Sequence, residues 1–451
     1  MIIGADVGGT FTDIVAVADG EVRSIKVPTS SPQSAGVARG AAAVSTGGVI
    51  ESLIHGTTVA TNALLERRGA NTVLVTDEGF EDVIEIARQD RPSLYDPLVD
   101  RSEPLVSRSS RVGVGPSGDI ASVPAAEAVA IALVDGHRDQ EKEAALATSV
   151  SELLPDASIS LSSVVAPEFR EFERVSTTVL NAYLTPVTGT YLRHLESELV
   201  DSGRAASVSV MRSSGGLMSL EAAASLPAAV LLSGPAGGVV ASQRLAKRIG
   251  LTDVVSFDMG GTSTDVCLIE DGVVDVSYER DIDGYTCRLP AVGVHTVGAG
   301  GGSIAWMDAG GSLRVGPQSA GAKPGPACYG QGGTAPTVTD ANVALGRIGS
   351  DAALGGTLEV DASLAREAIL RIAVPLGLSV QEAALGILRI SEATMAGAVR
   401  TVSIDAGANP AEAHLVAFGG AGGLHASSVA RSLGMAGVLV PPLAGVFSAV
   451  G

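Results

Sequence analysis

The sequence predicts an α/β protein with two structurally related halves. Two ten-residue stretches, ADVGGTFTDI at 5–14 and FDMGGTSTDV at 257–266, are identical at six positions and lie 252 residues apart. Each stretch starts in an apolar run, passes through a Gly-Gly turn and enters a second apolar run, which is typical of a β-hairpin. Strand patterns then alternate with helix patterns, which indicates an α/β layer. A duplicated domain is the simplest explanation.

The strands are predicted from short apolar runs bounded by glycine and polar residues. Two of them flank the first Gly-Gly turn, and the region around the second turn repeats the order strand, turn, strand. A further strand opens the stretch HLVAFGGAGGLHA at 414–426 and leads through a Gly loop into a helix. The two strands around the first turn cover residues 2–7 and 14–18, and the other predicted strands lie at 71–77 and at 207–216, the last ending in a Gly turn.

The helices are predicted from apolar periodicity and from end signals. In HGTTVATNALLERRG, at 55–69, Thr57 or Thr58 is expected to cap a helix and Gly69 to end it. A capping box formed by Ser379 and Glu382 begins a helix that runs to about residue 400. The remaining predicted helices cover residues 79–89 and 168–199, the second interrupted at Pro186.

Length and charge restrict the classes of function. A chain of 451 residues exceeds one typical core, and 46% hydrophobic with 18% charged residues suits a packed globular protein. The net charge of 30 − 49 = −19 disfavours binding to nucleic acid or to an anionic membrane. A phosphate ligand would therefore need backbone N–H groups and a metal ion.

Cysteine usage and the N-terminus predict a cytoplasmic protein. Cys267, Cys287 and Cys328 are odd in number and fit no zinc pattern, so free thiols are expected. The chain enters a strand directly, without the pattern of a signal peptide. Residues 222–243 carry no charge, but two prolines and three glycines among them predict buried strand and loop and no membrane span.

The repeated Gly-Gly-Thr turn suggests a phosphate site. Consecutive N–H groups without a Cβ allow close approach of a phosphate, and the threonine adds a hydroxyl donor. An aspartate repels phosphate unless Mg²⁺ or water lies between them. Two facing hairpins would clamp a polyphosphate. The alternative is that each Gly-Gly-Thr is only a tight turn.

Two further Gly loops complete a set. GAGGGS at 298–303 follows an apolar stretch, and GGAGG at 419–423 joins a strand to an apolar helix. Either loop alone is more often a plain connection. Together with the hairpins they suggest two loops for phosphates, one connecting loop and one loop for the nucleoside.

These features resemble the superfamily of actin, sugar kinases and heat-shock-chaperone ATPases, whose two ribonuclease-H-like halves close on ATP. More specifically, the chain resembles the hydantoinase A/5-oxoprolinase family, which includes N-methylhydantoinase and a subunit of acetone carboxylase. The resemblance rests on HGTTVATNALLERRG, ARQDRPSLYD, PEFREFERVSTTVLNAYL, SGPAGGVVA, FDMGGTSTDV, GAGGGSIAW, VGPQSAGAKPGPACYG and PTVTDANVALGRI. These motifs span nearly the whole chain.

The resemblance implies an N-terminal hydantoinase/oxoprolinase domain over 1–185 and a hydantoinase A core domain over 186–451. Two departures from the family stand out. Residues 135–145 (DGHRDQEKEAA) do not match the usual pattern, and the sequence stops at PPLAGVFSAVG, where relatives continue. The second domain is therefore expected to lack the family's C-terminal region.

The implied activity is ATP-dependent hydrolysis of a cyclic amide of the hydantoin or 5-oxoproline type, through phosphorylation of its carbonyl oxygen. Asp6 would hold Mg²⁺ directly or through water. Asp258 would orient or deprotonate the nucleophile, or share the metal. Asp13 and Asp265 would brace their hairpins or, alternatively, face the cleft. The implied phosphate-binding residues are Gly8, Gly9, Thr10, Thr12, Gly260, Gly261, Thr262 and Ser263. Gly419, Gly420, Gly422 and Gly423 would take the adenosine, and Gly300, Gly301 and Gly302 would line the base or the hinge.

The substrate residues are less defined. His55, Thr57 and Thr58 precede a predicted helix N-terminus that would favour a carboxylate or carbonyl oxygen. Alternatively the threonines cap the helix and His55 packs. Arg88 and Arg91 are candidates for an anionic substrate, or are solvated charges.

Several further candidate residues have a purely structural interpretation as well as a functional one. The helix PEFREFERVSTT is equally typical of a charged surface face. Lys323 could reach a phosphate or stay solvated, and Cys328 is interpreted as a structural thiol. His295 is left open between core and cleft.

Three other functions remain open. The first is a small-molecule or sugar kinase of the same superfamily, and the second is a non-enzymatic, nucleotide-gated regulatory protein. The third is the ATP-binding subunit of a ketone carboxylase, which bicarbonate dependence would reveal. Expected partners are a small cyclic amide, a hydantoinase B-type subunit and further copies of the chain in an oligomer.

Overall fold

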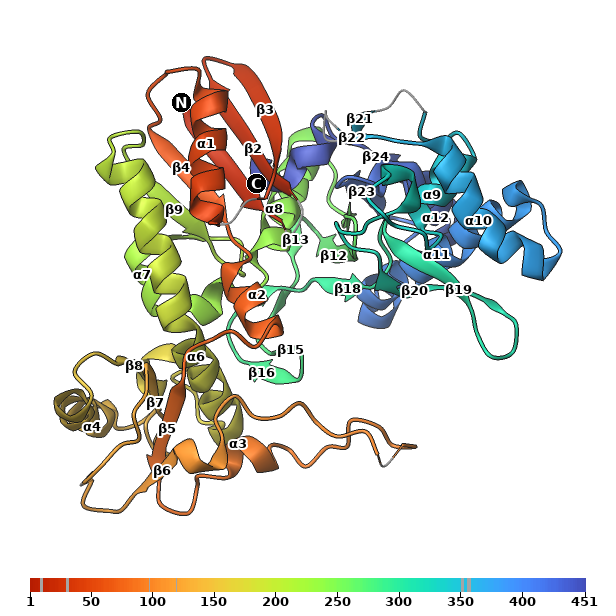
Figure 1. Ribbon diagram of the computed structural model, residues 1–451. Helices are drawn as coiled ribbons and strands as arrows, with labels where there is room; N and C mark the ends of the chain where they lie inside the picture. Colours follow the sequence, from red (N-terminus) through yellow and green to blue (C-terminus); the bar gives the residue numbers. More distant parts are fainter. Residues whose placement is uncertain (9–10, 30–31, 97, 119, 350–352, 355–357) are drawn as a thin grey trace. The chain divides into compact units, whose positions relative to one another are not determined.

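The computed structural model describes residues 1–451 except 9–10, 30–31, 97, 119, 350–352 and 355–357 (Figure 1). The chain forms two compact units, which are described separately. Unit 1 comprises Met1–Gly56, Gly234–Asp275 and Val292–Gly451, and unit 2 comprises Thr57–Ser233 and Val276–Ala291. The boundary expected between residues 185 and 186 lies inside helix α6 (Glu171–Glu196), and a domain division there stays a prediction.

The first sheet of unit 1 begins with the first repeated phrase. Strands β1 (Ile2–Val7), β2 (Phe11–Ala18) and β3 (Glu21–Pro28) are antiparallel, and β4 (Ser52–Gly56) pairs with β1 in parallel. Helix α1 (Gln33–Ser45) packs on β2 and β3. Ile3, Ala5 and Val7 are buried on one face of β1, so Asp6 points to the other face.

The second sheet of unit 1 repeats this design. Strands β11 (Val254–Met259), β12 (Thr264–Glu270) and β13 (Val273–Val274) are antiparallel. Strand β23 (His414–Phe418) pairs with β11 in parallel and β24 (Gly437–Leu439) pairs with β23. Strand β18 (His295–Val297) lies against β12. The accompanying helices are α8 (Ser233–Ile249), α11 (Val380–Ser403) and α12 (Gly422–Leu433).

The two hairpins have the same register. Asp6 pairs with Asp13 on β2, and Asp258 pairs with Asp265 on β12. The parallel neighbours correspond as well, since Asp6 lies beside Gly56 of β4 and Asp258 lies beside Phe418 of β23. The repeated phrase is therefore the start of a duplicated half, and the predicted duplicated α/β fold is confirmed.

A further part of unit 1 joins β18 to α11. Strands β19 (Ser303–Met307) and β20 (Leu313–Ser319) form a hairpin, and α9 (Val338–Ala344) packs against α10 (Ala362–Leu376) and α11. The apolar core of the second half includes Val255 and Phe257 from β11 and Ile387 from α11. Short elements of this unit are η4 (Ala327–Tyr329), β21 (Ala353–Leu354), β22 (Leu358–Glu359), η5 (Ile404–Ala406) and η6 (Ala444–Val450).

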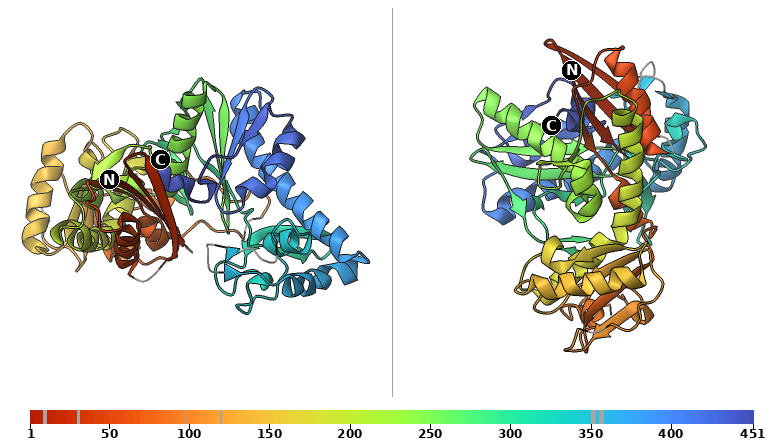
Figure 2. Two further views of the ribbon diagram at one scale, coloured as in Figure 1. Left: turned by 90° about the horizontal axis from the view of Figure 1, so that it is seen from above. Right: turned by 90° about the vertical axis from the view of Figure 1, so that its left-hand side faces the viewer.

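Unit 2 is built on a parallel sheet of four strands in the order β6-β5-β7-β8. These strands are β5 (Thr72–Asp77), β6 (Arg111–Val114), β7 (Ala128–Ile131) and β8 (Ser158–Leu161). Helix α6 packs along β7 and β8, as Figures 1 and 2 show. An apolar core of unit 2 includes Leu74, Val175 and Val179.

The remaining elements of unit 2 are short. Its other helices are α2 (Val59–Leu65), α3 (Val83–Ile86), η1 (Arg108–Ser110), α4 (Gln140–Leu153), α5 (Ser162–Val165), η2 (Ser197–Asp201), α7 (Leu220–Ser225) and η3 (Pro227–Val230). Strands β9 (Val208–Met211) and β10 (Leu217–Ser219) form one hairpin, and β15 (Arg280–Ile282) and β16 (Tyr285–Cys287) form another. Two further strands are β14 (Val276–Ser277) and β17 (Ala291–Val292).

Several predicted helix limits are wrong. Helix α6 continues through Pro186, because burial from Val175 to Leu184 outweighs one missing backbone hydrogen bond. The helix expected over 55–69 is shortened to α2, since its first residues complete β4. The helix expected over 79–89 is reduced to the single turn α3.

The uncharged stretch 222–243 is helical over much of its length, which corrects the prediction of strand and loop. Helix α8 contains Gly237 and Gly238 because other backbone and rings lie close to it. A Cβ on Gly237 would lie 2.5 Å from the Ser448 carbonyl oxygen, and one on Gly238 would lie 2.5 Å from the Phe418 ring. Within the described part of the chain, no single helix is long and apolar enough to cross a membrane, although α10 and residues 380–406, bent by 92°, pass that test as a pair.

Candidate functional site

Four aspartates from the two hairpins form an electrostatic cluster in unit 1. Burial, with the Asp13 charge, raises the pKa of Asp6 to about 7, although Lys26 opposes the shift. Burial raises the pKa of Asp258 to about 7 as well, and Asp265, Asp6 and Asp13 add to the shift. The carboxylates of the other hairpin therefore contribute to the raised pKa of Asp258. The four residues keep some solvent exposure.

Three of the four carboxylates have a specific partner. Lys26 Nζ lies 2.5 Å from Asp13 Oδ1, and Thr296 Oγ1 donates to Asp265 Oδ1 at 2.5 Å. Ser448 Oγ donates to Asp258 Oδ2 at 3.1 Å. Asp13 and Asp265 are thus each bonded to a neighbouring strand of their own sheet, and the bracing role stays a prediction.

The tip of the second hairpin is open. The N–H of Gly260 closes the turn by donating to Ser263 O at 3.0 Å, as the N–H of Gly8 does to Phe11 O at 2.9 Å. Gly261 and Thr262 are exposed, and no atom lies within 4 Å of a Cβ placed on Gly261. The corresponding residues of the first hairpin, Gly9 and Thr10, lie outside the described residues.

Thr12 is not placed to bind a phosphate, which corrects one predicted contact. Its side chain is buried, and its hydroxyl lies 3.3 Å from the Thr29 hydroxyl. The equivalent Thr264 is also buried and donates to Ala299 O at 2.5 Å. Both threonines therefore stabilise the base of a hairpin.

Gly300, Gly301 and Gly302 hold the second hairpin from behind. The N–H of Gly301 donates to Gly260 O at 3.0 Å, and that of Gly302 donates to Gly261 O at 2.6 Å. The N–H of Gly300 is taken by Ser303 Oγ at 2.8 Å. These three N–H groups are not free for a nucleotide, so the loop is the connecting member of the predicted set.

The loop Gly419–Gly423 lies directly beside Asp258. Gly419 has φ of +82°, and a Cβ on it would lie 2.2 Å from Asp258 Oδ1. Only glycine fits there. The loop turns at Ala421, whose N–H donates to Met259 O at 3.0 Å, and then enters α12. Gly420 and Gly423 are exposed and Gly422 is buried, which leaves the start of α12 accessible beside the carboxylate.

His55, Thr57 and Thr58 are engaged within the protein. His55 lies on β4 and not at a helix N-terminus, and it is fully buried with Nδ1 3.4 Å from Ala5 O. Burial lowers the pKa of His55 to about 4. Thr57 Oγ1 accepts from the Val59 N–H at 3.2 Å, and Thr58 Oγ1 lies 3.4 Å from Asn62 Nδ2. The buried His55 matches the packing alternative, whereas Thr58, at the N-cap of α2, makes no side-chain capping hydrogen bond.

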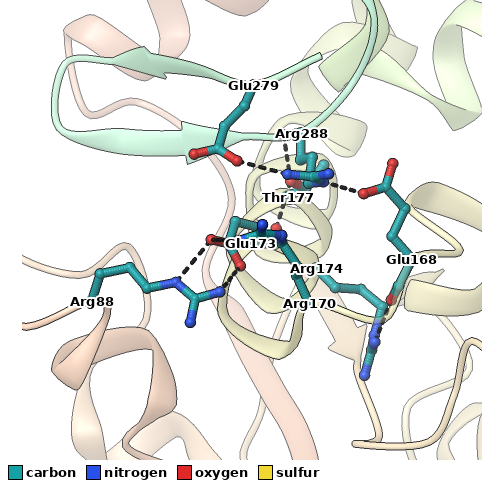
Figure 3. A network of polar contacts seen from close by, with 8 residues as sticks. All are labelled: Arg88, Glu168, Arg170, Glu173, Arg174, Thr177, Glu279 and Arg288. Atoms are coloured by element: carbon teal, nitrogen blue, oxygen red, sulfur yellow. Dashed lines mark hydrogen bonds and ion pairs between the residues drawn. The ribbon is translucent and has the colours of Figure 1, made fainter.

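Arg88 belongs to a network of polar contacts in unit 2 (Figure 3). Its Nε and Nη2 donate to the two carboxylate oxygens of Glu173 at 2.9 and 2.5 Å. Glu173 is 2% exposed, and Arg170 Nη1 lies 3.9 Å from it. Two of the three guanidinium nitrogens of Arg88 are therefore engaged by this nearly buried carboxylate. Arg91 is exposed.

The same network joins α6 to the β15–β16 hairpin within unit 2 (Figure 3). Arg288 forms ion pairs with Glu168 and, at 2.7 Å, with Glu279. Its backbone N–H donates to Thr177 Oγ1 at 2.8 Å. Arg174 is fully buried and donates to the carbonyl oxygens of Glu168, Leu133 and Val134. The motif PEFREFERVSTT therefore supplies interior contacts as well as a charged surface.

Replacement of Glu173 by glutamine should destabilise the protein by about 2 kcal/mol at neutral pH, because a paired buried carboxylate is lost. Burial raises the pKa of Glu173, but the hydrogen bonds and charges of Arg88 and Arg170 outweigh burial, so its pKa is lowered overall. Its contribution is therefore complete above pH 4.5, the ordinary value, and is lost as the pH falls further.

Denaturant unfolding at pH 7 and at pH 3.5 measures this difference. The difference in free energy of unfolding between the wild type and the Glu173→Gln variant should be smaller at the lower pH. Glu171→Gln, two residues away on α6, is the matched control. A gap of equal size at both pH values would contradict an ionised Glu173.

Cys328, Lys323 and His295 make no hydrogen bond or ion pair with the four aspartates in the described part of the chain, although His295 is next to Thr296, which donates to Asp265. Burial, with Asp340 nearby, raises the pKa of the Cys328 thiol, which matches a structural thiol. Lys323 is exposed, and His295 is half-buried on β18. A cavity of about 420 Å³ beside Cys328 and another of about 250 Å³ beside Phe172 do not include the four aspartates.

The donor set fits a magnesium–nucleotide complex better than a metal alone. No three His, Cys, Asp or Glu side chains of the described residues are grouped closely enough to hold a metal ion. Two crowded carboxylates with raised pKa values are nevertheless stabilised by a nearby cation. Mg²⁺ usually takes one or two carboxylates and completes its shell with water and phosphate oxygens.

Two aspartate-bearing hairpins in equivalent registers, with one exposed Gly loop beside Asp258, have the arrangement expected of an ATPase-type phosphoryl-transfer site. The comparison with known proteins then identifies the family. The N-terminal-region model of hydantoinase/oxoprolinase matches residues 2–121, and the hydantoinase/oxoprolinase model matches residues 174–451. The chain belongs to the hydantoinase/oxoprolinase family.

Curated relatives are longer than this chain. Caprolactamase subunit alpha of Pseudomonas jessenii is 37% identical, over 100% of this chain and 69% of the relative. The 5-oxoprolinase of Saccharomyces cerevisiae is 34% identical, over 89% of this chain and 35% of the relative.

Solved structures show the same fold. The ATP-dependent caprolactamase of Pseudomonas jessenii is similar with a TM-score of 0.87 and 36% identity, over 100% of this chain and 70% of the other. A nucleotide-free acetone carboxylase is similar with a TM-score of 0.83 and 26% identity, over 99% of this chain and 69% of the other. The actin-like ATPase fold expected from the sequence is therefore confirmed.

Proposed function

We propose that the protein is an ATP-dependent cyclic amide hydrolase that activates a lactam or cyclic imide by phosphorylating its carbonyl oxygen. The main support is the pair of hairpins in equivalent register, in which the charge of Asp6 adds to the effect of burial in raising the pKa of Asp258. The similarity to an ATP-dependent caprolactamase over the whole chain supports the same chemistry.

The reaction follows from the chemistry of the amide. An unstrained amide is a poor electrophile, so its carbonyl oxygen attacks the γ-phosphorus and ADP leaves. Water then adds to the activated carbon, the C–N bond breaks, and the nitrogen takes a proton. A second water attacks the carbon of the resulting acyl phosphate and releases phosphate. The products are ADP, phosphate and the ring-opened amino acid.

The chain's own residues position and stabilise these groups. Asp6 and Asp258 are the proposed Mg²⁺ and nucleophile-orienting carboxylates. When bound, Mg²⁺ would neutralise phosphate charge. Gly261, Thr262 and Ser263 at the open hairpin tip would receive phosphate oxygens.

The adenosine end of ATP is assigned to the loop beside Asp258. Gly420 and Gly423 are exposed at the start of α12, where free N–H groups of a helix N-terminus favour negative charge and polar oxygens. The absence of a Cβ at these positions allows close approach of the nucleoside.

Phosphate release from Mg-ATP tests the proposal, with 5-oxoproline, hydantoin and caprolactam offered in turn and ring-opened product measured alongside. Equal amounts of phosphate and ring-opened product are expected with one of them. A stable phosphorylated small molecule would instead indicate a kinase. Dependence on bicarbonate would indicate a carboxylase subunit.

We also propose that the chain acts beside a second, B-type subunit. Caprolactamase subunit alpha, which aligns with the whole chain, is itself named as a subunit. The loop after α3 offers a surface in unit 2, where Leu94, Tyr95 and Leu98 are 79%, 96% and 87% exposed. Arg101 fixes the base of this loop by donating to the Asp90 and Ile86 carbonyl oxygens. Exposed apolar groups on a fixed loop favour a protein contact.

A further inference from the structure

The segment η6 (Ala444–Val450) contacts both repeated halves of unit 1. It packs on β1 and β2 of the first sheet and on β23 of the second. Figures 1 and 2 show the last residues returning to the region of the first strands. No motif in this segment suggested a functional role.

Ser448 in this segment reaches one carboxylate of the candidate site. Its hydroxyl donates to Asp258 Oδ2 at 3.1 Å. The other oxygen, Oδ1, is packed so closely against Gly419 that a Cβ there would lie 2.2 Å away. The two carboxylate oxygens are thus held from different elements, and the hydroxyl fixes the rotation of the group.

The backbone around Ser448 is held by glycines of other elements. A Cβ on Gly4 of β1 would lie 1.8 Å from Ala449 O, and one on Gly237 of α8 would lie 2.5 Å from Ser448 O. The Phe447 ring packs on the Phe418 ring with centroids 5.1 Å apart. These contacts leave Ser448 little freedom to move away from Asp258.

The same segment also holds the Gly loop. The N–H of Gly419 donates to Ala444 O at 2.9 Å. One short segment therefore orients both the Asp258 carboxylate and the loop that packs against it. The contact through Ser448 limits the position of Asp258 Oδ2, and the contact through Gly419 limits the position of Oδ1.

We propose that Ser448 is a positioning residue that orients the Asp258 carboxylate for phosphoryl transfer. The proposal rests on the proposed function, in which Asp258 acts at the reacting groups. Without the hydroxyl, Oδ2 loses its donor and the carboxylate can rotate away from the productive orientation. Misplacement of a catalytic group lowers the rate of the chemical step more than it lowers nucleotide binding.

Steady-state ATP hydrolysis by the whole chain, with the stimulating cyclic amide, tests Ser448→Ala. We expect kcat to fall about 10-fold while KM for ATP changes less than about twofold. Ser432→Ala, which removes a hydroxyl that donates to the Val429 carbonyl oxygen within α12, is the control and should behave as the wild type. Thermal unfolding of both variants confirms that they are folded.

Two results would overturn the proposal. One is an unchanged kcat in Ser448→Ala, and the other is a rise in KM with unchanged kcat, which would show a binding role only. The Asp258→Asn variant separates this from failure of the proposed function. If Asp258→Asn keeps full ATP turnover, the role proposed for Asp258 is wrong. If Asp258→Asn is inactive and Ser448→Ala is fully active, only the role proposed for Ser448 is wrong.

Discussion

Replacement of Asp258 by asparagine should lower kcat for amide-dependent ATP hydrolysis by about 100-fold or more, as expected for a charged group at the reacting atoms. Asparagine keeps the size of the side chain and can still accept from Ser448 Oγ. It removes the negative charge that a metal or a nucleophile would use. Stability should not fall, because a neutral side chain avoids both the burial of a charge and the repulsion by neighbouring carboxylates, which together raise the pKa of Asp258.

Asp405→Asn is the matched control, because Asp405 is exposed on η5 of the same unit. It should leave kcat unchanged. Phosphate release and thermal unfolding are measured on both variants. If Asp258→Asn retained more than about half of the wild-type kcat, Asp258 would have no catalytic role.

Replacement of Gly419 by alanine should disrupt both stability and activity. The residue has φ of +82°, and the new Cβ would lie 2.2 Å from Asp258 Oδ1 and 2.5 Å from Met259 O. The backbone conformation costs about 1 kcal/mol for a residue with a Cβ, and the overlap adds about 1–3 kcal/mol. Movement of Asp258 to relieve the overlap would also lower kcat.

Gly434→Ala separates these two effects. Gly434 ends α12 with φ of +65°, and no atom lies within 4 Å of its Cβ position. This control should lose only the conformational contribution and keep its ATPase activity. Denaturant unfolding and phosphate release measure the difference, and equal losses in the two variants would show that the contact with Asp258 does not matter.

The duplicated fold could be predicted because short stretches of sequence carry its pattern. Asp6 and Asp258 occur in matching phrases, and the strand alternation around each phrase is typical of a hairpin. The capping box of Ser379 and Glu382 is confirmed for the same reason, since its residues lie three apart.

Long-range packing could not be predicted from these patterns. The glycines of α8 are typical of a loop in the sequence, but in the structure they allow Phe418 and Ser448 to pack closely against the helix. Pro186 breaks a local pattern, but burial of α6 keeps the helix continuous. His55 was assigned to a helix because its strand partner, Ala5, lies 50 residues away.

The candidate site was only partly predictable for a related reason. Thr12 shares the repeated phrase with Asp6, but alternation along β2 buries its side chain. The sequence does not show that the N–H groups of Gly301 and Gly302 are taken by the second hairpin. Ser448 carries no motif, and its contact with Asp258 spans 190 residues.

Phosphorylation of the amide carbonyl oxygen can be followed directly with an isotope label. The stimulating cyclic amide is prepared with ¹⁸O in its carbonyl group and hydrolysed with Mg-ATP in ordinary water. Mass spectrometry then locates the label. Because water attacks carbon in both hydrolytic steps, the account predicts ¹⁸O in the released phosphate. Label found only in the carboxylate of the ring-opened product would contradict it.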